Sequence, residues 1–212
     1  MQLYTIGHST YPVEHLLELL NKYQVNYIID VRSMPYSRYA SQYNSDVLKK
    51  TLNDAGIEYY HMKNSFGARQ EDPRYYNEEG YLDFEIFRAS EVFNKGMKNI
   101  EKGLEKYNIA LMCTEKNPID CHRAIMVGRG FELDGIDVKH ILHDGELLSQ
   151  EELNEQLLNR YFPEWGQLSL FDLAEGVSES ERKKDYLIKA YRCRNKEIGY
   201  RLKTGKEGNE VA

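Results

Sequence analysis

The chain lacks the features of a secreted or membrane-inserted protein. Its 212 residues include only three cysteines, which are too few and too unevenly spaced for a disulfide framework. No stretch approaches the roughly 20 consecutive apolar residues that a membrane-spanning helix needs. The first ten residues, MQLYTIGHST, contain no basic segment followed by an apolar run, as a signal peptide would. We therefore expect a cytoplasmic protein with reduced thiols and no membrane partner.

The chain also lacks an overall excess of positive charge. Its net charge of −6 argues against a nucleic-acid coat or a membrane-surface protein. The average hides an asymmetry, because Arg182–Lys206 contains ten basic and two acidic residues. The remaining chain therefore has a net charge of −14. The sequence predicts an acidic body followed by a basic C-terminal segment.

Internal repeats and low-complexity tracts are absent, and the chain instead alternates short apolar runs with helical periodicity. The apolar runs predict five strands: Gln2–Ile6, Val25–Val31, Ile57–Met62, Ile109–Cys113 and Ile136–Leu142. Helices are predicted between them, among them Asp83–Tyr107 with a break near Gly96 and a helix from Asp120 to Leu133 capped by Asp120. Strands separated by helices imply β-α-β crossovers. We expect an α/β fold, a mainly parallel Rossmann-like three-layer sandwich with a C-terminal linker and a basic helix.

Composition divides the chain into three parts. Residues 1–162 form the predicted α/β domain, 163–180 a linker, and 181–212 a basic helical tail. A helix over Ser180–Leu202 would present an apolar stripe that needs a cover. This favours docking onto the acidic body or an oligomer contact, with weak nucleic-acid binding as the alternative.

Polar side chains follow four of the predicted strands. Ligands of open α/β sheets bind beyond the carboxyl ends of the strands. The residues at these ends are His8 and Ser9 after the first strand, Asp30, Arg32 and Ser37 after the second, Gly67 and Arg69 after the third, and Cys113 and Glu115 after the fourth. The sequence therefore predicts a functional site at this edge of the sheet.

The segment from Cys113 to Arg123 is the richest in reactive groups. Cys121 would lie in the first turn of a helix, where free N–H groups and the helix dipole favour a thiolate. Arg32 and Arg123 could hold a phosphate or carboxylate. Cys113 could equally be a small buried apolar residue. A further alternative is a metal bound by Cys113, Cys121, His122 and His8, although the spacing of the cysteines is not that of a zinc finger.

Five short motifs occur together: Thr5–Ser9, Asp30–Arg32 with Pro35 and Ser37, Phe66–Arg69, Cys113–Glu115 and Cys121–Arg123. In combination they resemble a family of domains of unknown function, DUF488, over about residues 1–160. The resemblance implies the fold and a cluster of residues, without an established reaction. The site residues that it implies are His8, Ser9, Asp30, Arg32, Ser37, Gly67, Arg69, Cys113, Glu115, Cys121, His122 and Arg123.

The predicted linker contains a five-residue motif, Gln167-Leu168-Ser-Leu170-Phe171. It is similar to the pentapeptide that binds bacterial DNA sliding clamps. Gln167 would supply a polar anchor, and Leu170 and Phe171 apolar bulk for a groove. The alternative is that the segment folds back onto its own domain.

These observations favour an enzyme that acts on a phosphorylated or nucleotide-like substrate, which could be linked to DNA. Cys113 or Cys121 would be the nucleophile or redox thiol, His8, His122 and Glu115 the acid–base groups, with Asp30 also in the catalytic set. Ser9, Arg32, Ser37, Gly67, Arg69 and Arg123 would bind the anion. Alternatives are a non-catalytic binding module tethered to the clamp, and a metalloprotein. No dinucleotide or P-loop motif is present, so no cofactor is implied.

Overall fold

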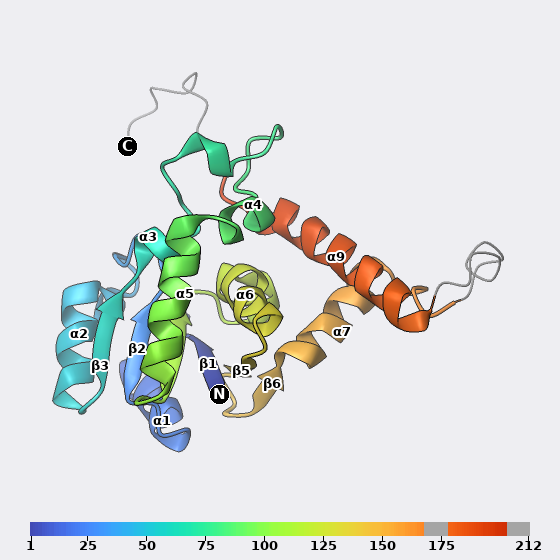
Figure 1. Ribbon diagram of the computed structural model, residues 1–212. Helices are drawn as coiled ribbons and strands as arrows, with labels where there is room; N and C mark the ends of the chain where they lie inside the picture. The colour runs from blue at the N-terminus through green and yellow to red at the C-terminus, as the bar shows by residue number, and fades with distance from the viewer. Residues whose placement is uncertain (168–177, 203–212) are drawn as a thin grey trace.

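A computed structural model describes residues 1–167 and 178–202. Six strands form one sheet in the order β3-β2-β4-β1-β5-β6. The strands are β1 Gln2–Gly7, β2 Tyr27–Asp30, β3 Glu58–His61, β4 Ile109–Cys113, β5 Asp137–Ile141 and β6 Leu147–Ser149. The first five are parallel to their neighbours, and only the sixth, which the sequence did not predict, is antiparallel. The mainly parallel α/β architecture is confirmed (Figure 1).

Helices cover both faces of the sheet. The α-helices are α1 Val13–Lys22, α2 Ser45–Asp54, α3 Lys63–Phe66, α4 Phe84–Arg88, α5 Glu91–Leu104, α6 Arg129–Leu133, α7 Gln150–Tyr161 and α9 Glu179–Ile198. Leu16 of α1 and Leu48 of α2 belong to one apolar core. Phe93 of α5 and Phe131 of α6 belong to the other. The two cores lie on opposite sides of the sheet because successive side chains of a strand point to opposite faces, which gives the three layers that the sequence predicts.

The helical region after Asp83 is broken, but not at Gly96. It ends at Arg88 and restarts at Glu91, with the Ser90 side chain accepting a hydrogen bond from the backbone N–H of Phe93. Gly96 lies inside α5, where a Cβ atom would come within 2.6 Å of the Ser65 Cβ. The predicted break at Gly96 was wrong because glycine here allows close packing of α3 against α5.

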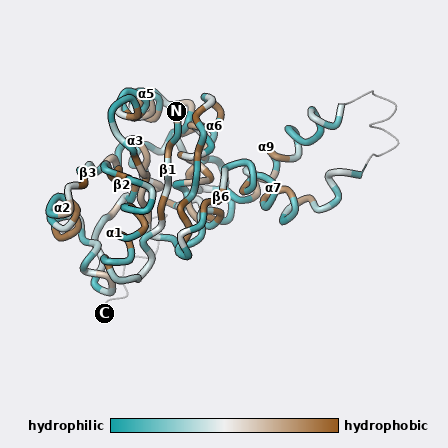
Figure 2. Tube along the Cα trace, turned by 90° about the horizontal axis from the view of Figure 1, so that it is seen from below, coloured by the Kyte–Doolittle hydropathy of each residue, from teal (hydrophilic) through white to brown (hydrophobic). Residues whose placement is uncertain are grey.

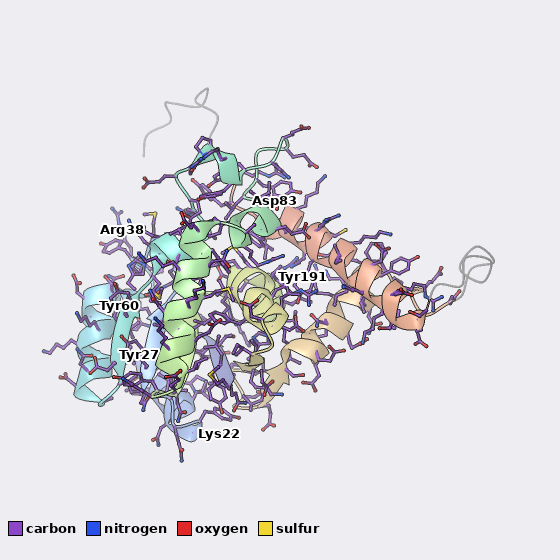
Figure 3. The ribbon with its side chains drawn as sticks, viewed as in Figure 1. Lys22, Tyr27, Arg38, Tyr60, Asp83 and Tyr191 are labelled. Atoms are coloured by element: carbon purple, nitrogen blue, oxygen red, sulfur yellow. The ribbon has the colours of Figure 1, made fainter. Side chains whose placement is uncertain are left out.

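The basic helix α9 packs along α7, and the pair, which consists mostly of hydrophilic residues, extends to one side of the sheet (Figure 2). Tyr191 points from α9 toward the body of the protein (Figure 3), where its hydroxyl donates to the Asn154 side chain. Lys183 pairs with Glu151, and Arg192 with Glu85. The predicted docking of this helix onto acidic groups of the body is confirmed. Among the described residues, no helix combines the length and apolar character that crossing a bilayer requires.

The segment after β4 differs from the predicted helix from Asp120 to Leu133. A 3₁₀ turn, Pro118–Asp120, comes first, and a buried π-helical segment, Arg123–Gly128, then leads into α6. Cys121 lies between them with extended backbone angles. The Asp120 carboxylate pairs with Arg194 of α9 and caps no helix. Cys121 is therefore not in a first helical turn, and its N–H donates to the Pro118 carbonyl.

Candidate functional site

The carboxyl ends of β1, β2 and β4 meet, because β4 lies between the other two strands. Gly7 is in register with Cys113, and Asp30 with Met112. The residues that follow these strands therefore lie side by side, as the sequence predicts. They form two adjoining groups: a cluster of thiol, carboxyl and imidazole side chains, and a buried network around Asp30.

The first group consists of Cys113, Glu115, Cys121 and His122, called the Cys–Glu–His cluster below. One potential ligand atom from each residue lies within 4.8 Å of all the others. The Glu115 Oε2 atom is 3.1 Å from the Cys113 Sγ and 2.9 Å from the Cys121 Sγ. The His122 Nδ1 atom is 3.7 Å from the Cys113 Sγ. The arrangement brings two thiols, one carboxyl and one imidazole to a single point.

Their proximity shifts the protonation of all four groups. Burial raises the pKa of the Cys113 thiol, and the adjacent Cys121 adds to the effect. Burial also acts to raise the pKa of Cys121, but the hydrogen bond with Cys113 and the charge of Arg123 outweigh it and lower that pKa. Burial and the negative charge of Cys121 raise the pKa of Glu115. The cluster thus places its negative charge on Cys121 and favours protons on its other acidic groups.

Backbone contacts fix the cluster in place. The His122 Nε2 lies 3.0 Å from the Val31 carbonyl oxygen, which leaves Nδ1 directed at the cluster. The fully buried Arg123 donates to the carbonyl oxygens of Glu115 at 2.6 Å and Lys116 at 3.1 Å. A Cβ atom on Gly7 would lie 1.9 Å from the Glu115 carbonyl oxygen. Glycine at position 7 and Arg123 therefore hold the loop that positions Glu115.

The second group is a buried ion pair between Asp30 and Arg32, the Asp30 network. The Arg32 Nε lies 2.9 Å from Asp30 Oδ1, and its Nη2 is 2.6 Å from Oδ2. The Tyr59 hydroxyl donates to Asp30 Oδ2 at 2.6 Å, and the Arg32 backbone N–H donates to Oδ1. Both oxygen atoms of this buried carboxylate therefore accept hydrogen bonds, as a charged group in a protein interior requires.

His8 joins the Asp30 network. Arg32 Nη1 donates to its Nε2 at 3.1 Å, and its Nδ1 lies 2.7 Å from the Ser9 carbonyl oxygen. The ring stacks on Tyr43 at 3.9 Å between centroids. Burial and the charge of Arg32 lower the pKa of His8 to about 4, so the imidazole is neutral at pH 7. Among the described residues, the group with metal-ligating geometry contains Glu115 in place of the predicted His8.

A pocket of about 260 Å³ opens onto the cluster. Cys113, Glu115 and His122 line it together with Arg32 and the exposed Arg69. Its lining residues are Arg32, Ser33, Met34, Ala68, Arg69, Cys113, Thr114, Glu115, Asp120, His122, Ile198 and Tyr200. The pocket therefore joins a group of reactive side chains to a guanidinium that faces solvent.

Several predicted anion-binding residues have other contacts. The Ser37 hydroxyl accepts the backbone N–H groups of Tyr39 and Ala40 at 3.2 Å. Gly67 packs where a Cβ would come within 2.5 Å of the Lys63 carbonyl oxygen. Ser9, Ser37, Gly67 and Arg123 do not line the pocket, whereas Arg32 and Arg69 do. Of the linker motif, the structure describes only the exposed Gln167, and Leu168, Leu170 and Phe171 lie outside the described residues.

Sequence reasoning missed four residues of the site. Tyr59 and Tyr43 contact Asp30 and His8 from β3 and from a 3₁₀ turn, Ser41–Tyr43. Ile198 and Tyr200 reach the pocket from the end of α9. Tyr59 is the buried residue in a strand whose side chains alternate between buried and exposed, and this alternation is a weak sequence signal. The contacts of Tyr43, Ile198 and Tyr200 depend on tertiary packing, which leaves no local pattern.

Fold and site together define an α/β protein with a polar pocket over a thiol-rich cluster at the carboxyl edge of its sheet. The sequence model of the family described as domain of unknown function DUF488 matches residues 12–129, more than half of the chain. The chain belongs to this family. Comparisons with curated proteins and with solved structures gave no match. The family match includes the whole Cys–Glu–His cluster but ends before Ile198 and Tyr200.

Proposed function

We propose that this protein is an enzyme that acts on a small anionic, nucleotide-like substrate, and that the Cys–Glu–His cluster binds a zinc ion at the base of its pocket. The observation that supports this proposal is the convergence of four ligand atoms within 4.8 Å. Zinc prefers thiolate and imidazole ligands in a tetrahedral set, with a carboxylate or water completing it.

The orientation of His122 supports a metal ligand. Its Nε2 faces the Val31 carbonyl oxygen at 3.0 Å, and its Nδ1 faces the thiols. Metal-bound histidines commonly donate their other ring N–H to a backbone carbonyl, which fixes the tautomer and the ring. Cys121 and His122 are also buried, so their positions are set by packing.

The charges of the cluster give a second argument. Each of the two thiols lies within hydrogen-bond distance of the Glu115 carboxyl group. When all three are ionised, they repel each other strongly in a buried environment unless a cation lies between them. A divalent cation would remove the need for shared protons.

The proposed zinc ligands differ in their surroundings, which indicates different roles for them. Cys113 closes the rigid strand β4, whereas Glu115 belongs to the exposed loop and lines the pocket. If the cluster held a zinc ion, Glu115 would be the ligand best placed to give way to water or substrate, and it would then be available as the acid–base group. Arg69 would bind the anionic group, because it is exposed and lines the pocket. Arg32 is already neutralised by Asp30.

Thiol catalysis is the second candidate, favoured by the position of Cys113 in the pocket wall. In this case Cys113 would be the nucleophile and the adjacent His122 its base.

A non-catalytic binding module is the third candidate, and ligand binding that survives serine substitution of both cysteines would select it. The DNA setting rests on the linker motif and remains a prediction. Clamp pull-down with Gln167→Ala and Phe171→Ala variants tests it.

A zinc titration against a chromophoric chelator tests the metal proposal. We expect one tight site per chain in the wild type, and a loss of affinity of at least tenfold in Cys113→Ser and Cys121→Ser. Cys193→Ser is the matched control, since this third cysteine lies on α9 outside the cluster. Weak binding by the wild type, or equal affinity in all three variants, would contradict the metal site. Activity of the metal-free protein that is lost in Cys113→Ala would then support thiol catalysis.

A further inference from the structure

The pocket over the cluster continues into a second, larger pocket of about 750 Å³. The two share Ser33, Met34, Arg69 and Tyr200 in their walls. A substrate whose reacting group occupies the first pocket therefore has room to extend past Arg69 and Tyr200. The site has the shape of a groove for part of a longer chain.

A stacked cation and ring stand between the two pockets. The Arg69 guanidinium lies 4.8 Å from the centroid of the Tyr200 ring. Tyr200 is positioned by its carbonyl oxygen, which accepts the Leu82 backbone N–H at 2.9 Å. The Ser33 hydroxyl accepts the Arg69 backbone N–H at 2.8 Å. A fixed planar ring beside a cation suits a ligand that alternates flat bases with phosphates.

The loop that follows Ser33 and Met34 displays further aromatic rings. Tyr36 is 68% exposed and Tyr39 is 98% exposed, with the exposed Arg38 between them. The loop is nevertheless ordered, because the Ser37 hydroxyl accepts two backbone N–H groups, and the Asn44 side chain accepts the Ser37 N–H at 2.7 Å. Figure 3 shows Arg38 extending outward near α3. The backbone that carries these exposed rings is therefore already ordered before binding.

The charge around this loop also favours a polyanion. The segment between Asp30 and Asp46 contains no acidic residue, and its Arg38 is exposed. The second pocket adds Lys63 and Arg69 opposite two carboxylates, Glu71 and Asp72. Asp72 is paired with Arg74 at 2.6 Å and is neutralised. In the second pocket, Lys63 and Arg69 therefore face the single remaining carboxylate of Glu71.

We propose that this groove binds single-stranded nucleic acid, with one nucleotide entering the pocket over the cluster. The neighbouring phosphate lies on Arg69, the adjacent base stacks on the Arg69–Tyr200 pair, and further bases stack on Tyr36 and Tyr39. This inference rests on the proposed function for the identity of the reacting nucleotide, but strand binding itself needs neither metal nor chemistry.

Fluorescence anisotropy with a labelled 12-nucleotide single strand of thymidine tests the proposal. We expect saturable binding that weakens as salt rises, and a loss of about fivefold or more in Tyr36→Ala/Tyr39→Ala, Arg69→Ala and Tyr200→Ala. The control is Tyr107→Ala, an exposed tyrosine before β4 at the opposite edge of the sheet. A duplex of the same length should bind more weakly, because its bases are not free to stack. Polyglutamate serves as a second polyanion without bases.

The proposal is overturned if neither the DNA strand nor RNA of the same sequence binds, if Tyr107→Ala and Tyr36→Ala/Tyr39→Ala behave alike, or if polyglutamate competes as well as the unlabelled strand. RNA of the same sequence shows whether the 2′-hydroxyl matters, and binding of either strand supports the groove. Zinc content is measured on each variant. Unchanged zinc content with lost strand binding separates this inference from the metal site. Strand binding by wild-type protein that takes up no zinc would contradict the metal site alone.

Discussion

The two adjoining groups of the site balance their charges in opposite ways. In the Asp30 network one carboxylate meets a guanidinium, a tyrosine hydroxyl and a backbone N–H, all buried. In the Cys–Glu–His cluster three acidic groups surround a single imidazole. The first arrangement is complete as it stands, whereas the second needs either shared protons or a cation.

This difference indicates that the Asp30 network has a structural role and the Cys–Glu–His cluster a chemical one. Asp30 does not line the pocket, while Cys113, Glu115 and His122 do. The Asp30 network also holds the end of β2 beside His8, so it fixes the relative positions of the strand ends next to the cluster. We expect substitutions in the network to change stability, and substitutions in the cluster to change zinc binding and activity.

The largest effect should come from breaking the network with Asp30→Ala. This leaves the buried Arg32 charge without its partner and should cost about 3–5 kcal/mol of unfolding free energy. Urea denaturation monitored by circular dichroism measures it. The chain provides a matched control in Asp72→Ala, since Asp72 and Arg74 have the same spacing and the same hydrogen bonds at the surface. Equal stability losses in the two variants would show that burial of the pair is irrelevant.

Zinc should stabilise the cluster side of the comparison. At a free zinc concentration 100 times the dissociation constant, ligand binding raises the unfolding free energy by about 2.7 kcal/mol. Thermal or urea denaturation with and without zinc measures this gain, which should disappear in Cys121→Ser. A gain that persists in this variant would place the stabilising ion elsewhere.

Tyr59→Phe sharpens the comparison by removing one hydrogen bond to Asp30 and nothing from the cluster. A hydrogen bond to a buried charged group contributes about 1.5–3 kcal/mol, so we expect a loss near the lower value because Arg32 remains. Zinc affinity should change less than twofold. A tenfold fall in zinc affinity would show that the two groups act as one unit.

A separate, pH-dependent effect involves His140, which belongs to neither group. Burial and the charge of Arg123 lower its pKa to about 3, and its Nδ1 contacts the Thr5 hydroxyl at 2.8 Å. Below pH 6.5 the unfolded chain takes up a proton that the folded protein does not, so stability falls as pH decreases toward 3. This costs up to about 1.4 kcal/mol for each pH unit. His140→Gln should reduce that slope, and an unchanged slope between pH 6.5 and 4.5 would refute the assignment.

Much of the sheet was predictable from local sequence. Runs such as Ile109–Cys113 are fully buried, and an apolar run of this length is typical of a central parallel strand. The carboxyl-edge rule then places the residues after β1, β2 and β4 together. The three-residue strand β6 was missed because it is short and half-buried, so its pattern is no stronger than that of a loop.

The candidate site was predictable only in part, and the grouping of its residues was not predictable. His8 belongs to the Asp30 network because Arg32 donates a hydrogen bond to it. Glu115 is the fourth member of the cluster because it accepts a hydrogen bond from Cys121. A sequence cannot show this, because both residues follow strands at the same edge of the sheet. Arg123 was predicted to bind an anion, yet its guanidinium holds the loop carbonyls of Glu115 and Lys116. Such contacts depend on the path of the irregular loop after β4.

X-ray absorption spectroscopy of the zinc-loaded protein tests the central claim most directly. The account predicts two sulfur ligands at about 2.3 Å and two nitrogen or oxygen ligands at about 2.0–2.2 Å. Cys121→Ser should reduce the sulfur count by one, and Cys193→Ser should leave it unchanged. A coordination shell without sulfur would contradict the assignment of the Cys–Glu–His cluster as a metal centre.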